Sequence, residues 1–505
     1  MSIFDDISLW KELLPELQNQ SADEIQKYLC ELTELDLSHR NDISTLPESI
    51  GELSNLQELD LYDCHNFTTL PENIGQLSNL QELDLCGCNL TILPKSIERL
   101  NNLKILDLSY CTNLITLPEH NGELSNLQIL NLSHCSNLTM LPESIGQLSN
   151  LEMLGLSDCE NFTISFESIS QLNHLQKLCL WCHNLTTLPE NIGQLSHLQE
   201  LDLSGCKNLR RLPESIGQLS HLRVLNLERC KLFRKLPESI GQLSSLRVLN
   251  LESCKKIATL PASIARLNNL QELHLSGRKN FNTLLENIGL LSNLQKLNLY
   301  GCDNFTTLPE NIGQLNNLQE LYLDKCDNPV TLLENIHRLG NLKKLNLWCD
   351  ILNTLPESIG QLNNLQELHL IGCKNLTTLP ESVGQLSNLQ KLRLNRCKNF
   401  TMLPESIGQL SNLQELDLSD CDNLTTLPES IGELSNLQEL DLSYCKNLTT
   451  LPESMGKLSN LQKLSFNGCE NLTTQSENIR QLKDLKKFDK PQKISLLSKI
   501  ISFFK

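Results

Sequence analysis

The sequence predicts an α/β solenoid, a coil built from stacked copies of one short repeat. A segment of 23 or 24 residues recurs nineteen times, the first copy beginning at Leu32 and the last at Leu461, and a fixed period in this range is typical of solenoids. Residues 416–419 of one copy, Leu-Asp-Leu-Ser, alternate with the two-residue period of a half-buried strand. Residues 427–434 place three apolar side chains at i, i+4 and i+7, which suits a short helical or 3₁₀ segment.

Each element of the copy that spans residues 413–436 has a physical reason. Leu416 and Leu418 give the strand its buried face, and Cys421 then turns the chain inward. Pro428 fixes φ and removes a donor, so the strand cannot continue, and we expect Gly432 to permit the tight return. One copy cannot bury its leucines alone, so each needs a neighbour on both sides. We therefore expect a curved coil, with parallel strands on the concave face and the short helical segments on the convex face.

The motif C-x-N-L-x-x-L-P-x-x-I-G-x-L resembles the leucine-rich repeat family from Leu32 to about Leu485. It is similar to the repeat regions of plant resistance receptors, of Ras-group scaffolds and of repeat proteins from bacteria that live inside host cells. The resemblance implies recognition of proteins on the concave face. No GxxxxGK[ST] motif occurs, so the nucleotide-binding half of a resistance receptor is not expected. The predicted layout is a helical cap at 1–31, a solenoid of nineteen repeats at 32–485 and an amphipathic basic helix or tail at 486–505.

The cap prediction depends on residues 21–24, Ser-Ala-Asp-Glu, which have the spacing of a capping box. Apolar residues follow at helical spacing, so this segment can cover the open end of the first copy. An alternative interpretation takes residues 14–17, Leu-Pro-Glu-Leu, as a trace of an F-box, which would make the protein a substrate adaptor of a ubiquitin ligase.

Charge excludes some partners. The formal net charge of −18 and pI near 5.1 argue against a general binder of nucleic acid, so no nucleic-acid partner is expected. Residues 207–256 depart from this pattern with 11 basic and 4 acidic residues. They form either a solvated belt that balances acidic neighbours or a surface for an acidic partner or a phosphoinositide.

Cysteine recurs at one repeat position, that of Cys421, in seventeen copies, while Arg40 and Arg278 replace it in the other two. We expect a small buried side chain there, whose S–H bonds a carbonyl of the adjoining copy, and reduced thiols fit a cytosolic chain. Residues 179–183, Cys-Leu-Trp-Cys-His, have the spacing of haem attachment, but the two thiols should point to opposite sides. No catalytic, metal or cofactor motif is present, so we expect a non-enzymatic protein without cofactors.

The candidate binding residues lie between the strand leucines, on the expected concave face. Glu and Asp fill these positions near both ends of the coil, whereas aromatic and basic residues appear toward the middle. Tyr, Trp and Arg are favoured at interface hot spots. The predicted protein-binding residues are Trp181, His274, Tyr300, Tyr322, Trp348, His369 and Arg393.

The tail sequence KISLLSKIISFFK can form a helix with one apolar stripe, which either caps the last copy or makes a peripheral contact with a membrane surface. It is too short to cross a bilayer, and no secretory signal is expected at the amino terminus. We therefore expect a cytoplasmic scaffold that binds another protein, in signalling, immunity or host–pathogen interaction, and that is delivered into a host cytoplasm if the chain is bacterial. A ubiquitin-ligase adaptor and a membrane-tethered signalling scaffold are the alternatives.

Overall fold

The computed structural model describes residues 2–119, 123–163, 165–277, 287–301, 310–324, 333, 335–472 and 487–489. The chain divides into two compact units. The N-unit comprises Met1–Ile257 with Pro261–Leu270, and the C-unit comprises Ala258–Leu260 with Gln271–Lys505.

Each unit contains a parallel sheet with one short strand per copy. In the N-unit the strands are β1 (Glu34–Asp36), β2 (Glu58–Asp60), β3 (Glu82–Asp84), β4 (Ile105–Asp107), β5 (Ile129–Asn131), β6 (Met153–Ser157), β7 (Lys177–Trp181), β8 (Glu200–Asp202), β9 (Val224–Asn226) and β10 (Val248–Asn250). Each pairs in parallel with the next along the chain, with equivalent residues side by side, as Leu35 with Leu59. The strand prediction is confirmed.

The C-unit repeats this arrangement. Its strands are β11 (Glu272–His274), β12 (Lys296–Asn298), β13 (Glu320–Asp324), β14 (Lys344–Trp348), β15 (Glu367–His369), β16 (Lys391–Arg393), β17 (Glu415–Asp417), β18 (Glu439–Asp441), β19 (Lys463–Ser465) and β20 (Lys487–Asp489). They pair in parallel and in register throughout. β20 pairs with β19, so the parallel sheet has one further strand just beyond residue 485, the predicted end of the coil. The helix predicted over the tail lies outside the described residues.

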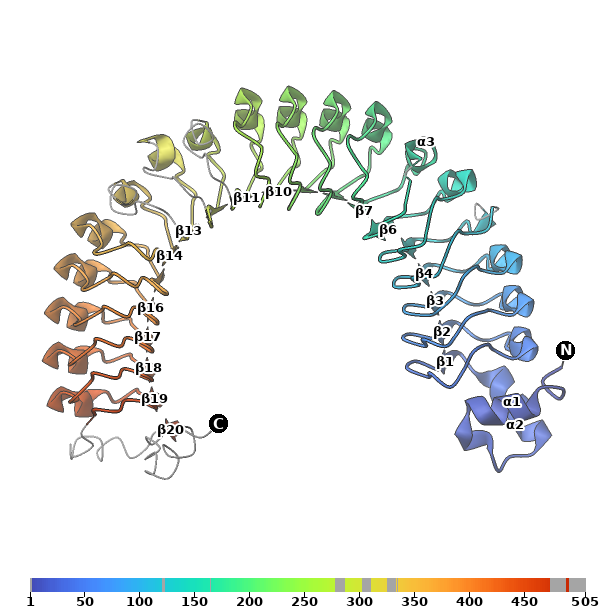
Figure 1. Ribbon diagram of the computed structural model, residues 1–505, viewed down its shortest axis with the longest axis horizontal. Coiled ribbons are helices and arrows are strands. Elements are labelled where there is room, and N and C mark those ends of the chain that lie inside the picture. Colours follow the sequence, from blue (N-terminus) through green and yellow to red (C-terminus); the bar gives the residue numbers. More distant parts are fainter. Residues whose placement is uncertain are drawn as a thin grey trace, which may run out of the picture. The chain divides into compact units, whose positions relative to one another are not determined.

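The segments opposite the strands are mostly 3₁₀ helices, and within each unit they form the outer side of the arc while the strands form the inner side (Figure 1). In the N-unit they are η2 (Glu48–Glu52), η3 (Glu72–Gln76), η4 (Lys95–Arg99), η6 (Glu143–Gln147), α3 (Phe166–Ile169), η7 (Glu190–Gln194), η8 (Glu214–Gln218), η9 (Glu238–Gln242) and η10 (Ala262–Arg266). In the C-unit they are η11 (Ile288–Leu290), η12 (Glu310–Gln314), η13 (Ile336–Arg338), η14 (Glu357–Gln361), η15 (Glu381–Gln385), η16 (Glu405–Gln409), η17 (Glu429–Glu433) and η18 (Glu453–Lys457). The predicted concave and convex placement is confirmed.

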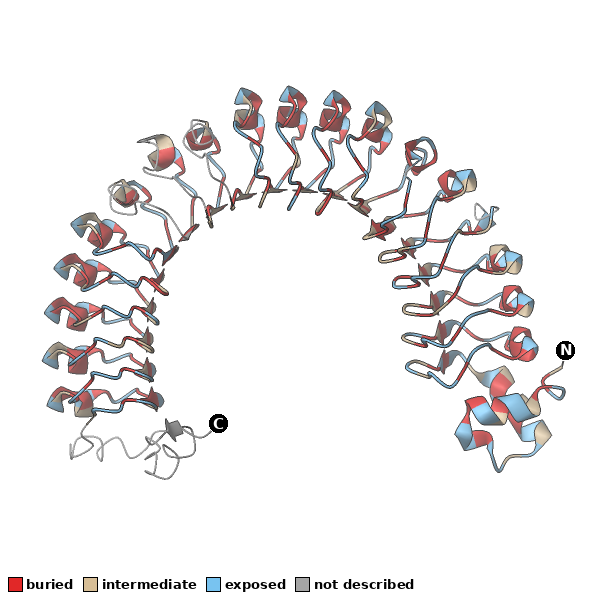
Figure 2. Ribbon diagram, viewed as in Figure 1, coloured by how far each residue is buried: buried red, intermediate tan, exposed pale blue. Residues whose placement is uncertain are grey.

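The core lies between the strands and the outer segments, where buried residues from both meet (Figure 2). In the copy that begins at Leu413, every apolar position of the motif is buried, from Leu416 in the strand to Leu434 after η17. Proline precedes η17, as predicted, because its extended backbone at Pro428 starts the 3₁₀ turn. In the sixth copy Phe166 replaces this proline, and the outer segment becomes the short α-helix α3.

The role expected for Gly432 is wrong. This glycine lies inside η17, and a Cβ there would collide with the carbonyl oxygen of Ser454 in the next copy, so glycine allows the outer segments to stack closely. The tight turn instead falls three residues after the end of β17, where Asp420 has φ of 58°, and many equivalent residues are also left-handed.

The N-terminal segment contains α1 (Ile7–Leu13), η1 (Pro15–Leu17) and α2 (Ala22–Glu31). The capping box is confirmed, since Ser21 and Glu24 exchange hydrogen bonds at the start of α2. Trp10 of α1 is fully buried and donates through Nε1 to Ser49 Oγ of η2 at 2.9 Å. The segment therefore packs against the outer side of the first copy. In the described part of the chain, no helix is long and apolar enough to cross a membrane.

Candidate functional site

Six of the seven predicted binding residues lie in the C-unit, while Trp181 lies in the N-unit. His274, Tyr322, His369 and Arg393 occupy the strand position of Asp417. Tyr300, Trp348 and Trp181 occupy the position of Ser419, two residues later. Because successive side chains of a strand alternate between faces, both positions face the concave side of the sheet.

Tyr300 and Trp348 form the aromatic part of this face. Their ring centroids are 6.5 Å apart and their planes are tilted by 59°, although the two residues belong to copies that are not adjacent. Trp348 remains 37% exposed, which is high for an indole at the end of a central strand. The pair therefore offers a large apolar surface that the described residues of its unit leave partly exposed.

Tyr322 lies on β13, which pairs with β12 on one side and β14 on the other. Tyr300 follows β12, and Trp348 is the last residue of β14. Its hydroxyl donates to Glu320 Oε2 at 2.9 Å, and Lys296 Nζ lies 5.7 Å from the ring centroid. Partial burial, together with the carboxylate of Glu320, raises the pKa of Tyr322 well above its usual range. Tyr322 is therefore a fixed, neutral ring at physiological pH.

The remaining predicted residues are less available. His369 is only 6% exposed, and burial beside Lys344 and Arg393 lowers its pKa to about 4. Arg393 donates through both Nε and Nη2 to Glu415 Oε1, each at 2.7 Å. His274 is half-buried and lies 3.2 Å from Glu272. His369 was predicted as a binding residue of the concave face, but its neighbours Lys344 and Arg393 in adjacent copies leave its ring almost fully buried.

Sequence reasoning missed an alternating charge ladder in the strand position of Glu415. From β11 to β17 this position reads Glu272, Lys296, Glu320, Lys344, Glu367, Lys391 and Glu415. Lys344 Nζ lies 2.9 Å from Glu367 and Lys391 Nζ lies 3.6 Å from it. The alternation at intervals of 23 or 24 residues was visible in the sequence. The alternating Glu and Lys residues make this part of the C-unit nearly neutral, so it can contact either acidic or basic groups of a partner.

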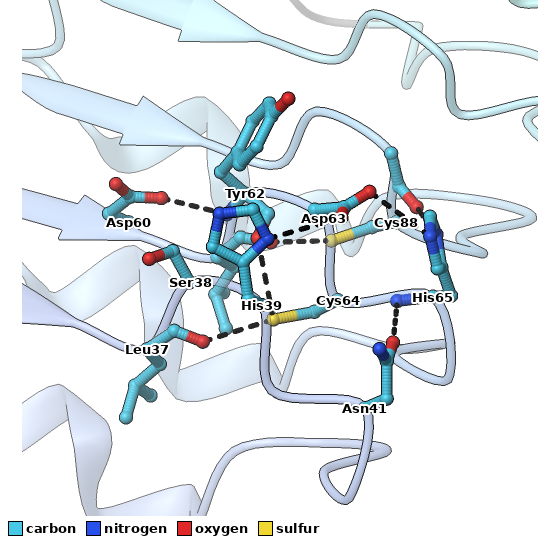
Figure 3. Close-up of polar contacts among 12 residues, drawn as sticks. Leu37, Ser38, His39, Asn41, Asp60, Tyr62, Asp63, Cys64, His65 and Cys88 are labelled. Atoms are coloured by element: carbon cyan, nitrogen blue, oxygen red, sulfur yellow. Dashed lines mark hydrogen bonds and ion pairs between the residues drawn. The ribbon is translucent and has the colours of Figure 1, made fainter. Parts of the chain in front are cut away.

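In the N-unit the same position begins with three glutamates, Glu34, Glu58 and Glu82, on neighbouring strands. Their mutual repulsion, chiefly that of Glu82, raises the pKa of Glu58. The aspartates beside them also have a structural role. Asp60 accepts a hydrogen bond from the backbone N–H of Tyr62 at 2.7 Å, which ends the strand (Figure 3). Part of the predicted acidic stripe is therefore built into the turn.

An open groove of about 730 Å³ adjoins the aromatic pair at the end of the strands. Trp348 and Gly372 line one part, and the other lining residues are all charged. Asp350 and Lys374 pair at 3.0 Å, and Asp422 and Lys446 pair at 3.1 Å. Trp348 therefore belongs both to the aromatic part of the face and to this groove. The groove was not predicted, because its walls come from turns of several copies.

The cysteine prediction is confirmed for the described residues. All fifteen cysteines at the position of Cys421 that the structure describes are buried and free, and each donates through Sγ to a carbonyl of the preceding copy, as Cys64 does to Leu37 at 3.1 Å (Figure 3). Cys302 and Cys326 lie outside the described residues. Cys179 is partly exposed and Cys182 is buried, so they do not form a haem-attachment pair. Within the described ranges, no group of three or more His, Cys, Asp or Glu could hold a metal ion.

The repeated strand, 3₁₀ turn and buried leucine core define a solenoid of a kind that typically serves as a scaffold for protein interaction and not as an enzyme. A model described as a leucine-rich repeat region matches residues 151–230, 214–325 and 322–426, and one described as a leucine-rich repeat matches 126–148 and 436–458. A further model, Zer-1-like leucine-rich repeats, matches 23–123. The chain belongs to the leucine-rich repeat family.

Solved structures agree with this assignment. A leucine-rich repeat protein of Leptospira interrogans is 34% identical, with a TM-score of 0.56, and the match covers 88% of this chain and 98% of that one. The TLR13–ssRNA13 complex matches at 22% identity over 92% of this chain and 71% of that one, with a TM-score of 0.66. An internalin of Listeria monocytogenes matches at 18% identity over 72% and 95%, with a TM-score of 0.50. The last two show the fold alone. None of the curated proteins matches the chain.

Proposed function

We propose that the protein is a non-enzymatic scaffold that binds a partner protein on the concave face of the C-unit, with Tyr300, Tyr322 and Trp348 as the central contacts. The observation that carries the proposal is the exposed indole of Trp348, which lies 6.5 Å from the Tyr300 ring and borders the charged groove. A large, partly exposed aromatic cluster beside charged groups has the composition of an interface hot spot.

The neighbouring ladder favours a partner with mixed charge. Lys344 and Glu367 already neutralise each other at 2.9 Å, so this part of the face does not select strongly for one sign. Apolar contact with the aromatic pair would supply most of the affinity, and the ion pairs around it would set orientation. Arg393 is held by Glu415 and contributes at the edge of the interface.

The experiment is affinity capture with the intact chain, identification of the bound protein and measurement of its dissociation constant with purified components. The triple variant Y300A/Y322A/W348A should weaken binding by well over tenfold, and Trp348→Ala should have the largest single effect. The matched control removes three exposed tyrosines elsewhere, Tyr62, Tyr110 and Tyr444, which are 41%, 53% and 53% exposed. Unchanged affinity in the triple variant, or an equal loss in the control, would overturn the proposal.

We also propose that the protein works in a reducing compartment, the cytoplasm, in host–pathogen or signalling interactions. The free buried thiols support this location, because a ladder of S–H donors depends on cysteines that stay reduced. The host–pathogen part of the proposal rests on the resemblance of the repeat motif to repeat proteins of bacteria that live inside host cells. Fractionation of cells that express the intact chain tests the location, and recovery in an oxidising compartment with intact fold would contradict it.

A further inference from the structure

A second charged surface lies in the N-unit, on the flank formed by the turns that follow strands β8, β9 and β10. Eight basic residues there are exposed and belong to three consecutive copies. We call this surface the basic flank; it consists of Lys207, Arg210, Arg211, Lys231, Arg234, Lys235, Lys255 and Lys256. The three other basic residues of 207–256 lie elsewhere. Arg223 and Arg247 immediately precede β9 and β10, and Arg229 pairs with Glu228 at 3.2 Å.

The backbone holds the basic flank in columns. Arg210 donates its N–H to the carbonyl of Thr186 at 3.0 Å, and Arg234 donates to the carbonyl of Arg210 at 3.1 Å. Arg211 forms parallel bridges with Thr187 on one side and Lys235 on the other. Equivalent residues of neighbouring copies are therefore about 5 Å apart, the spacing of parallel strands. The backbone that carries the cations is therefore already ordered, and only their side-chain rotamers need to be fixed on binding.

The positive charges of the basic flank are not neutralised by carboxylates within the described part of the chain. Among the described residues, no carboxylate forms an ion pair with any of the eight cations. Of the nearest acidic residues, Glu228 pairs with Arg229, and Glu214 accepts the N–H of Ser239 at 3.1 Å on the outer side. Several like charges lie within one screening length, about 8 Å at physiological ionic strength, so their repulsion is incompletely screened.

In the C-unit, two lysines at the repeat position of Lys207 and Lys231 are paired with aspartates. Lys374 and Lys446 each directly follow the cysteine that recurs in most copies, just as Lys207 and Lys231 do. Each is paired with an aspartate of the adjacent copy, Lys374 with Asp350 at 3.0 Å and Lys446 with Asp422 at 3.1 Å. In the basic flank lysine instead follows lysine from copy to copy. The missing counter-charge is what an external anion would provide.

Several observations limit the class of anion. None of the exposed large hydrophobic residues lies within 207–256, so the flank has neither an aromatic platform for nucleic-acid bases nor an apolar group to enter a membrane. Arginine forks bind carboxylates through two hydrogen bonds. Within each column, equivalent cations of neighbouring copies are about 5 Å apart, which lies between the spacing of consecutive residues (about 3.4 Å) and alternate residues (about 6.8 Å) in an extended chain. A run of consecutive acidic residues therefore keeps a carboxylate within reach of each cation.

We propose that the basic flank binds an extended acidic segment of a partner protein, rich in Asp and Glu, independently of the concave face of the C-unit. Arg210, Arg211, Arg234 and Lys235 make the central contacts, and the lysine column extends them toward the strand ends. The surface is separate in sequence and unit from Tyr300, Tyr322 and Trp348, so either binding activity can fail without the other.

The test uses fluorescence anisotropy with the intact chain and a labelled peptide of twenty glutamates. The variant R210T/R211T/R234T/K235T places threonine at positions where threonine occurs in other copies, such as Thr425 and Thr426, so the fold should be kept. It should weaken binding at least tenfold. The control K104Q/R223Q/R247Q/K343Q also removes four positive charges, each at the repeat position where other copies have glutamine, such as Gln414, and it leaves both the basic flank and the groove beside Trp348 intact. It should change affinity less than twofold.

Binding of the peptide should also weaken steeply as salt rises from 50 to 300 mM. Three results would overturn the proposal: no binding of the peptide at 50 mM salt, an equal loss in the test and control variants, or tighter binding of polyuridylate or phosphatidylserine vesicles than of the peptide. Circular dichroism of both variants confirms that a loss of binding does not reflect unfolding.

Discussion

The indole of Trp348 lies directly against Gly372 of the next copy, so that a Cβ added to Gly372 would stand 2.6 Å from Trp348 Nε1. The same arrangement recurs in the N-unit, where Trp181 occupies the space that a Cβ of Gly205 would need. In both places the sequence pairs tryptophan with a glycine in the following copy. The glycine gives the indole a flat backbone surface to lie on, and this holds Trp348 in position at the edge of the groove.

We expect Gly372→Ala to displace Trp348. Overpacking of this kind costs about 1–3 kcal/mol, or the side chain must rotate away from its site. The expected result is a lower urea midpoint for the C-unit together with a shift in tryptophan emission. Binding of the partner captured by the intact chain should fall by a factor similar to that of Trp348→Ala.

Alanine substitutions at two other glycines serve as controls that distinguish the collision with Trp348 from the other effects of adding a methyl group. Gly301 has φ of +63°, but its nearest atoms would lie 3.7 Å from a Cβ, so Gly301→Ala introduces backbone strain without a collision. Gly340 has no atom within 4 Å of a Cβ position, so Gly340→Ala should be nearly neutral. If Gly372→Ala is no more destabilising than Gly301→Ala, the contact with Trp348 does not constrain the indole.

Much of this fold could be predicted because the buried positions repeat. Leu416, Leu418 and Ile431 recur in nearly every copy, and a pattern with that regularity allows only stacked strands and short outer turns. The outward positions are different, because their environment depends on contacts between copies. The burial of His369 and the packing of Trp348 against Gly372 both depend on contacts between residues of neighbouring copies. Gly432 was misread for the same reason, since its function concerns the next outer segment and not its own turn.

Arg40 should anchor the N-terminal segment. It replaces the cysteine of other copies, and its guanidinium donates to the carbonyls of Leu13 at 2.8 Å and Glu12 at 3.3 Å at the end of α1. Arg40→Cys removes these hydrogen bonds, because cysteine is too short to reach. We expect the stability of α1 to fall by about 1–3 kcal/mol, measured as faster amide exchange.

The effect of Arg40→Cys should stay local, because each copy of a solenoid contacts only its neighbours. Amide protection in the distant copies around η15 serves as the internal reference. Unchanged protection in α1 would show that Trp10 and its contact with Ser49 hold the segment without Arg40.

The buried thiols should resist alkylation in the folded protein. Burial raises the pKa of Cys88 to about 12 and that of Cys421 well above its ordinary value, so neither forms a reactive thiolate at pH 8. Among the described cysteines, iodoacetamide can reach only the partly exposed Cys30, Cys86 and Cys179, so these should be labelled first at pH 8. Cys179 should be the slowest of the three, because burial raises its pKa to about 11. Mass spectrometry of each cysteine peptide measures this order. Labelling of Cys421 at the rate of Cys30 would contradict the buried ladder.

His369 should make the C-unit sensitive to mild acid. Burial, with Lys344 and Arg393 nearby, lowers the pKa of His369 to about 4 from an ordinary value near 6.5. Between these two pH values the unfolded chain binds a proton that the folded chain does not, so stability is highest above pH 6.5 and falls as the pH drops toward 4. The size of this loss is about 3 kcal/mol as an upper figure.

Replacement of His369 by glutamine should remove this component. The difference in urea unfolding free energy between wild type and His369→Gln should therefore change across pH 6.5 to 4, with the variant losing less stability than wild type. Carboxylates titrate in both proteins, so their contribution cancels in the difference. Parallel pH profiles for the two proteins would show that the imidazole is protonated at little cost in the folded state, and that Glu367, 3.5 Å from Nε2, compensates for its burial.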